Sequence, residues 1–332
     1  APEGLAADYA RAARAECVHD SLCVAACPVK IDTGALMKEL DAAERSFLSK
    51  SAADFAASHF ALSASGARSA LAAAARLASG GPGSKALLRA GSSLLHALAP
   101  SLSPGNTDGL AFPLPAPKPP TPRPGGAREV VYFPACVSRI FGALPGEDGP
   151  STMEAVVACL EAAGHRVVIP EGIDGLCCGL AFSSQSQPEA AARARGASED
   201  ALRKATRDFT LPVVTDASPC ALAFLGEAGR ELRVFDFASY WAREVLTRSD
   251  APQGRVPGRA VLHPTCSLTK LGAVSDFLSV AKAHAEDPVV PLRAGCCGFA
   301  GHHGFTQPEI TEGATRSEAE DVKSLAAEAR QV

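Results

Sequence analysis

The chain has 332 residues, 47% of them hydrophobic, and a formal net charge of −4 at pH 7. This composition is typical of a folded protein of two or three domains and excludes a disordered chain. The mildly acidic balance argues against a nucleic-acid partner. The sequence shows neither an apolar run long enough to span a bilayer nor the pattern of a signal peptide, so a cytoplasmic location is expected.

The eleven cysteines are many for a chain of this length. Their number is odd, and two pairs are adjacent, Cys177–Cys178 and Cys296–Cys297. Adjacent cysteines cannot easily bridge each other, but both can reach one metal centre, so a disulfide framework is not expected. Thiolates clustered in a reducing compartment favour an iron–sulfur cluster or zinc.

Residues 1–44 contain the run CVHDSLCVAACP, which follows the pattern C-x2-D-x2-C-x3-C-P. A bacterial ferredoxin run has four cysteines, C-x2-C-x2-C-x3-C-P, that hold 4Fe-4S clusters. Cys17, Cys23 and Cys27 are therefore predicted cluster ligands. In paired runs the fourth cysteine ligates the other cluster, so Cys27 is expected to serve a second cluster. The segment is predicted to be the second half of a ferredoxin-like domain.

Asp20 stands where such a run has its second cysteine. Two interpretations stay open. A carboxylate is a harder and weaker iron ligand than a thiolate, so Asp20 as a ligand would leave one iron exchangeable and favour a 3Fe-4S centre. The alternative is a surface aspartate beside a cluster that other groups hold.

Residues 45–110 are rich in alanine and leucine and predict a helical connector, interrupted by Gly80 to Gly83. Leu48, Phe55 and Leu62 recur at helical spacing, so we expect packed helices. The alternative, peripheral contact with a membrane surface, would be favoured by a basic face that the segment lacks. Residues 111–126 follow, with seven prolines between 113 and 124. They predict a semi-rigid, extended linker at a domain boundary.

Beyond this linker, strands alternate with helices. Runs rich in β-branched residues predict strands within 128–136, 165–170 and 211–220, and helices are predicted at 150–164 and 187–209. Ser151 and Glu154 form the pattern of a capping box, and Gly164 is a predicted helix C-cap. Strands that alternate with helices predict a parallel sheet.

This part of the sequence repeats itself. VVYFPACVSRIFG at 130–142 aligns with AVLHPTCSLTKLG at 260–272, and GLCCGLAFSSQSQPE at 175–189 aligns with AGCCGFAGHHGFTQPE at 294–309. Two matched pairs in the same order indicate two copies of one unit. We call residues 127–250 the first unit and residues 258–332 the second. The expected fold is α/β: a helical ferredoxin-like remnant and helical connector, then two repeated α/β units with parallel sheets.

The cysteines of the first unit each follow one of three successive predicted strands: Cys136, Cys177, Cys178 and Cys220. The carboxyl ends of parallel strands lie at one edge of a sheet, where ligands bind. We therefore predict that the four thiolates meet there and hold a cubane cluster or zinc. The second unit offers three predicted metal ligands: Cys266, Cys296 and Cys297.

Other side chains near these motifs have structural or open roles. Cys159, inside a predicted helix, is expected to be a small apolar core residue. Arg139, close to Cys136, either stabilises an anionic cluster or is a surface arginine. His263 is expected to be structural. His302 and His303 are alternative ligands for the second unit or solvent-exposed histidines.

The second unit lacks a counterpart of Cys220. Cys220 lies 42 residues after Cys178, and the same spacing in the second unit passes the end of the sequence at Val332. The sequence also begins with Ala1 rather than Met. We therefore expect a piece of a longer protein, with a strand and a cysteine following Val332.

The motifs FPAC, GLCCG, SPC, HPTC and GCCGFAG resemble the paired cysteine-rich CCG domains of heterodisulfide reductase B-type subunits. They are also similar to the iron–sulfur subunits of glycolate oxidase and anaerobic glycerol-3-phosphate dehydrogenase. Together with CVHDSLCVAACPVKIDTG and TDASPC, they occur in the same order in the C-terminal half of respiratory-type FAD-linked D-lactate dehydrogenases. Heterodisulfide reductase motifs end in C-x2-C and supply five thiolates, but here Ala217 replaces the first of that pair. An ordinary four-thiolate cluster or zinc fits four cysteines better.

This resemblance implies an FAD domain, absent from this chain, that oxidises a D-2-hydroxy acid such as D-lactate. Electrons would leave the flavin through iron–sulfur clusters here, toward a quinone or cytochrome, at the inner face of a membrane. The chain alone would have no dehydrogenase activity. Two alternatives stay open: a separate iron–sulfur subunit of a glycolate or lactate oxidase complex, and a zinc-binding, non-redox interaction module.

Overall fold

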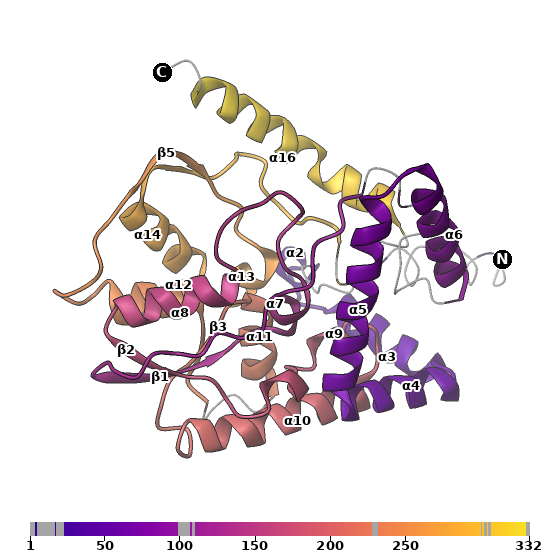
Figure 1. The fold of residues 1–332 in the computed structure, drawn as a ribbon, viewed down its shortest axis with the longest axis horizontal. Coiled ribbons are helices and arrows are strands. Elements are labelled where there is room, and N and C mark those ends of the chain that lie inside the picture. Colours follow the sequence, from indigo (N-terminus) through magenta and orange to yellow (C-terminus); the bar gives the residue numbers. More distant parts are fainter. Residues whose placement is uncertain are drawn as a thin grey trace.

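The computed structural model describes residues 4, 17, 23–98, 107, 110–227, 232–299, 301, 304 and 307–329 (Figure 1). Asp20, His302 and His303 lie outside these residues, so their predicted roles stay predictions. The described part combines helices with two parallel sheets, which confirms the predicted α/β fold class. None of its helices is both long and apolar enough to cross a membrane.

The first unit is built on a sheet of parallel strands in the order β2–β1–β3–β4. The strands are β1 (Arg128–Phe133), β2 (His165–Val168), β3 (Val213–Thr215) and β4 (Val234–Asp236). The first three match the predicted runs, whereas β4 was not predicted. A strand of three residues is too short for a period-2 pattern, and only its pairing with β3 defines it.

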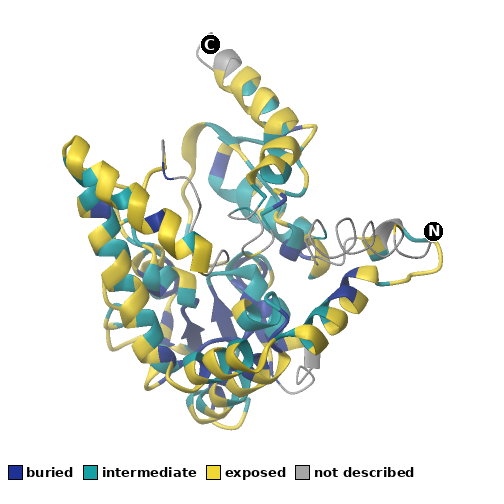
Figure 2. Ribbon diagram, turned by 90° about the vertical axis from the view of Figure 1, so that its right-hand side faces the viewer, coloured by how far each residue is buried: buried dark blue, intermediate teal, exposed yellow. Residues whose placement is uncertain are grey.

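The side chains of β1 alternate between two cores, as the pleat of a strand requires. Val130 and Tyr132 face one core, together with α8 (Thr152–Ala162) and η4 (Trp241–Val245). Val131 and Phe133 face the other core, together with α10 (Pro188–Ala205) and α11 (Ser218–Glu227). Since helices cover both faces, residues 130–133 of β1 are fully buried, and Figure 2 shows the buried residues gathered on these central strands.

Helix α8 begins at the predicted capping box. The Ser151 hydroxyl accepts from the Glu154 amide, while the Glu154 carboxylate accepts from the Ser151 amide at 2.8 Å. Gly164 follows the helix with a φ of 77°.

The prediction for Cys159 was wrong: this residue is exposed. The buried stripe of α8 consists of Met153, Val156, Val157 and Leu160, and Cys159 lies outside it.

The second unit repeats the order strand, short helix, helix, strand, helix. Its elements are β5 (Val256–Val261), α13 (Cys266–Lys270), α14 (Val274–His284), β6 (Ala285–Val289) and α16 (Pro308–Ala329). Strands β5 and β6 pair in parallel, as β1 and β2 do. The two units contact each other where Trp241 donates a hydrogen bond of 2.8 Å to His284 and Arg243 forms an ion pair with Asp276.

The region before the units is helical, as predicted. It contains α2 (Cys23–Ala26), α3 (Thr33–Glu44), α4 (Phe47–Ser58), α5 (Phe60–Ala78) and α6 (Pro82–Leu98). However, the leucines and phenylalanine expected to pack are exposed: Leu48, Phe55 and Leu62 are 78%, 56% and 64% exposed. Ala57 and Phe60 make the contact with the first unit instead. Small side chains let α4 approach α10 closely, so the apolar spacing predicted the helices but not their buried side.

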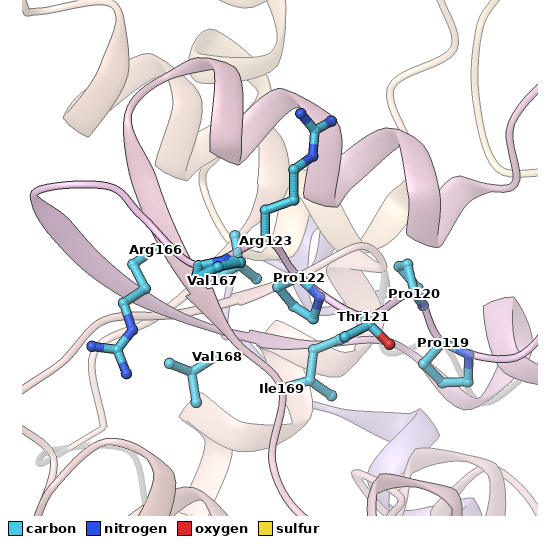
Figure 3. A pocket seen from close by; sticks show the side chains of 10 residues that line it. Pro119, Pro120, Thr121, Pro122, Arg123, Arg166, Val167, Val168 and Ile169 are labelled. Carbon is cyan, nitrogen blue, oxygen red and sulfur yellow. The ribbon is translucent and has the colours of Figure 1, made fainter.

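The proline-rich segment lies against the first unit rather than standing free as a spacer. The Leu114 and Ala116 amides donate to backbone carbonyls after α7 (Cys136–Ile140) and at its end, and Ala116 is buried in the core. Arg123 pairs with Glu161 of α8. Between this segment and β2 lies an open hollow of about 450 Å³, whose lining includes Pro119, Pro120, Pro122 and Pro124 (Figure 3).

Candidate metal centre

The structure brings the four cysteines of the first unit together at the carboxyl edge of its sheet. Cys136 begins α7 directly after β1, and Cys177 and Cys178 lie between η3 (Ile173–Gly175) and α9 (Leu180–Ser183), after β2. Cys220 lies in the first turn of α11, after β3. The Cys178 and Cys220 sulfurs are 3.3 Å apart, and Cys177 hydrogen bonds to both Cys136 and Cys178. Three loops that are distant in sequence thus bring four thiols to one place.

These thiols are largely buried, and the surroundings of Cys136, Cys177 and Cys178 favour the protonated form. A hydrogen bond with Cys177 raises the pKa of Cys136, and burial adds to this. For Cys177, the hydrogen bond with Cys136 lowers the pKa, but the bond with Cys178 and burial outweigh it and raise the pKa to about 12. Metal ligation requires thiolates, so metal binding at this site would release protons.

A glycine gives the cysteine pair its local geometry in both units. The Gly179 amide donates to the Cys177 sulfur at 3.4 Å, and the Gly298 amide donates to the Cys296 sulfur at 3.4 Å. Their φ angles are 84° and 66°, a region that glycine enters without strain. The repeated CCG sequence therefore produces the same turn twice, with an amide donor directed at a sulfur.

Arg139 is a buried residue of this site, so the surface alternative was wrong: it is only 4% exposed. Its Nε donates to the Pro134 carbonyl at 3.1 Å and its Nη1 donates to the Ile173 carbonyl at 2.5 Å. Its Nη2 donates to the carbonyl of Leu176, the residue before the cysteine pair. One side chain on α7 therefore ties the Cys136 loop to the loop of Cys177 and Cys178.

Asp216 connects the Cys136 loop to the third loop, and it was not among the predicted site residues. Its carboxylate accepts from the Tyr132 hydroxyl and from the Ala135 amide, both at 2.7 Å. The residue lies between the end of β3 and Cys220. An acidic residue directly after a buried strand, in VVTDASPC, was the available signal.

The second unit places its cysteines in equivalent loops. Cys266 begins α13 after β5, and Cys296 and Cys297 follow β6. The helix starts of the two units touch, because the Ser218 hydroxyl lies 2.6 Å from that of Ser267. Cys220 and Cys266 therefore belong to adjacent helix N-termini.

His263, which was expected to be structural, precedes α13 in this unit. It hydrogen bonds to Glu318 of α16 at 2.6 Å. This contact ties the end of β5 to the last described helix of the unit.

A comparison with protein-family models finds that the model described as "Cysteine-rich domain" matches residues 130–224 and 260–330. Together these matches cover half of the chain. The chain belongs to the cysteine-rich domain family. We therefore call residues 130–224 the first cysteine-rich domain and residues 260–330 the second.

Curated proteins similar to this chain include one of the subunits of anaerobic glycerol-3-phosphate dehydrogenase, from Escherichia coli K12 and from Escherichia coli O157:H7. Each is 24% identical over 138 residues, which is 39% of this chain and 35% of the relative. The match thus spans about a third of the length of these relatives. No solved structure shows significant similarity.

The donor set of the first cysteine-rich domain suits an iron–sulfur cluster. Cubane clusters are held by cysteine thiolates, and hydrogen bonds to sulfur and burial tune them. This domain offers four thiols, an amide donor to sulfur and a buried guanidinium. Across the described residues, however, no three Cys, His, Asp or Glu side chains already surround a point that could hold a metal ion. The assignment of these cysteines as ligands therefore stays a prediction.

The described cysteines of the ferredoxin-like run also receive hydrogen bonds. The Thr33 hydroxyl donates to the Cys23 sulfur at 3.1 Å, and the Ile31 amide donates to the Cys27 sulfur at 3.4 Å. Cys23 is exposed, and Cys17 and Cys27 are half-buried. Donors directed at sulfur suit a cluster site.

The pKa of Cys23 gives a pH prediction for the metal-free protein. The hydrogen bond from Thr33 is the main cause that lowers the pKa of Cys23, and the hydrogen bond from the Gly34 amide lowers it further. Partial burial instead raises the pKa of Cys159. Because the thiolate is the nucleophile, alkylation of Cys23 should reach half its maximal rate at lower pH than alkylation of Cys159. Thr33→Val should move the Cys23 profile to higher pH and leave the Cys159 profile in place. Site-resolved mass spectrometry after iodoacetamide pulses measures both alkylation profiles. A Cys23 profile that does not move in Thr33→Val would show that the Thr33 hydrogen bond does not lower the pKa of Cys23.

Proposed function

We propose that this chain is the iron–sulfur electron-transfer part of a dehydrogenase. The observation that carries the proposal is the meeting of four thiols from three strand ends in the first cysteine-rich domain. The match to a subunit of an anaerobic glycerol-3-phosphate dehydrogenase supports a role in a dehydrogenase. Cys136, Cys177, Cys178 and Cys220 would hold the cluster.

A bound cluster would supply one-electron transfer, and the residues of the chain would set its surroundings. Burial of Cys177 and Cys178 excludes water from the sulfurs, and the Gly179 amide donates to one of them. Arg139 and Asp216 hold the three loops together. In the second domain, Cys266, Cys296 and Cys297 would contribute to a further centre, and Cys17, Cys23 and Cys27 would bind clusters of the ferredoxin-like domain, with or without Asp20.

The finer proposal is an FAD-linked D-2-hydroxy acid dehydrogenase that acts on D-lactate. The order of motifs along the whole chain supports it, whereas the curated match covers only part of the chain and names glycerol 3-phosphate. An FAD-containing domain or subunit would deliver the electrons, and a quinone or cytochrome would receive them at the inner face of the cytoplasmic membrane. Dye reduction by the chain joined to its flavin partner, with D-lactate, glycolate and glycerol 3-phosphate compared, distinguishes these substrates.

The decisive experiment is anaerobic purification followed by iron, acid-labile sulfide and zinc analysis, with EPR spectra before and after reduction by dithionite. We expect iron and sulfide in equal amounts and an EPR signal of a reduced cluster. Zinc without sulfide would overturn the proposal and favour a non-redox interaction module.

A further inference from the structure

Arg139 carries a positive charge in a place where charge is costly. Its side chain lies below the protein surface, and each hydrogen bond found for its guanidinium goes to a backbone carbonyl. Among the described residues, no carboxylate forms a direct ion pair with it; the Asp216 carboxylate accepts from the Ala135 amide and the Tyr132 hydroxyl instead. A buried guanidinium without a counter-charge is strongly destabilising, because carbonyl dipoles replace only part of its hydration. The location therefore suggests a negative group nearby that the site acquires.

The cysteines are that negative group once they hold a cluster. Arg139 lies on α7 three residues after Cys136, and its guanidinium reaches the loop that carries Cys177 and Cys178. Its Nη2 bonds the carbonyl adjacent to Cys177. On the outer side, Arg68 of α5 donates from Nη1 to the Arg139 carbonyl at 2.5 Å, which fixes the end of α7. The charge is thus held in one position between the Cys136 loop and the loop of Cys177 and Cys178.

We propose that Arg139 is a positioning residue whose fixed charge raises the reduction potential of the cluster in the first cysteine-rich domain. This inference rests on the proposed function. When the oxidised cluster accepts one electron from a flavin-containing partner, the negative charge of the site increases by one. A fixed positive charge stabilises that reduced state more than the oxidised state, because the Coulomb energy grows with the charge of the cluster. The electron then leaves to the acceptor and the oxidised cluster is restored.

Asp216 provides a test of the proposal, because its charge should shift the reduction potential in the direction opposite to that of Arg139. It lies at the same edge of the sheet and joins the Cys136 loop to the Cys220 loop, but its charge is negative. Asp216→Asn keeps an oxygen for the Ala135 amide and an amide group that can donate to the Tyr132 hydroxyl. Loss of Arg139 should lower the reduction potential, whereas loss of the Asp216 charge should raise it. Mere loosening of the cysteine loops would not reverse in sign between the two variants.

The experiment is an EPR-monitored redox titration of the anaerobically purified protein. The signal of the first domain is the one that Cys136→Ala abolishes. Arg139→Gln should move its midpoint to more negative potential, Asp216→Asn to more positive potential, and Arg139→Lys should stay near the parent. Arg203→Gln is the matched control, because it removes one positive charge from an exposed pair with Asp208 in the same domain. It should leave the midpoint unchanged.

An unchanged midpoint in Arg139→Gln, or shifts of equal sign in Arg139→Gln and Asp216→Asn, would overturn the inference. If Arg139→Gln retains no cluster, Arg139→Lys decides, since lysine keeps the charge without the three hydrogen bonds. If Arg139→Lys retains a cluster with the parent potential, the positive charge is what matters and the proposal is supported. If Arg139→Lys also loses the cluster, the role of Arg139 lies in its hydrogen bonds, and the proposal is overturned. A parent protein that contains zinc and no sulfide would instead overturn the proposed function.

Discussion

Replacement of Cys178 with alanine is expected to remove the cluster of the first cysteine-rich domain without unfolding it. Its sulfur lies at the centre of the thiol group, 3.3 Å from that of Cys220 and hydrogen bonded to Cys177. A cubane cluster is held by four cysteine thiolates, so three thiols would leave one iron without a protein ligand. The variant should lose about one cluster of iron and sulfide per chain. The lost side chain is small, so the free energy of unfolding of the metal-free protein should fall by only about 1 kcal/mol.

Cys159→Ala is the matched control for this experiment. Cys159 lies exposed on α8, outside the carboxyl edge of the sheet, and its loss should leave iron, sulfide and the EPR signal unchanged. Iron and sulfide contents that are the same in Cys178→Ala and the parent would show that the four thiols do not hold a cluster.

Gly179→Ala should destabilise the first domain and displace the cysteine pair. The residue has a φ of 84°, and a Cβ there would lie 2.5 Å from the Ala191 carbonyl oxygen in α10. The left-handed backbone costs an alanine about 1–2 kcal/mol. Overpacking against the α10 backbone adds roughly 1–3 kcal/mol. Chemical denaturation of the metal-free protein should therefore show a loss of about 2–5 kcal/mol, together with reduced cluster content in the purified protein.

Gly172→Ala separates the two causes. Gly172 has a φ of 67°, but a Cβ there would meet nothing within 4 Å. This variant should lose only the backbone part, about 1–2 kcal/mol, and keep its cluster. Equal losses in the two glycine variants would mean that the contact with α10 does not restrict the cysteine loop.

Local sequence signals predicted the elements well where the local chain determines them. The β-branched runs predicted β1, β2 and β3, and Ser151 and Glu154 predicted the start of α8. The self-similarity of the chain predicted a second parallel pair of strands, and β5 and β6 confirm it. These predictions succeeded because strand propensity and helix capping depend on a few neighbouring residues.

The candidate site was predictable only in part. The rule that parallel strands end at one edge was enough to expect Cys136, Cys177, Cys178 and Cys220 in one place. The polar groups that surround them were not predictable, because Arg139 bonds to Ile173, 34 residues away, and Asp216 bonds to Tyr132, 84 residues away. The same limit explains why Cys159 and Leu48, which were expected to be buried, are exposed. Helical spacing shows which side of a helix is apolar but not which surface covers that side.

By itself, the sequence determined the α/β class, the internal repeat and the positions of the cysteines along the chain. Only the tertiary structure decided which thiols touch, that Arg139 is buried between two cysteine loops and that Asp216 joins the third. The physical reason is the range of the interactions involved. Caps and strand patterns act over a few residues, whereas the surroundings of a sulfur are set by loops that meet only after the sheet has formed.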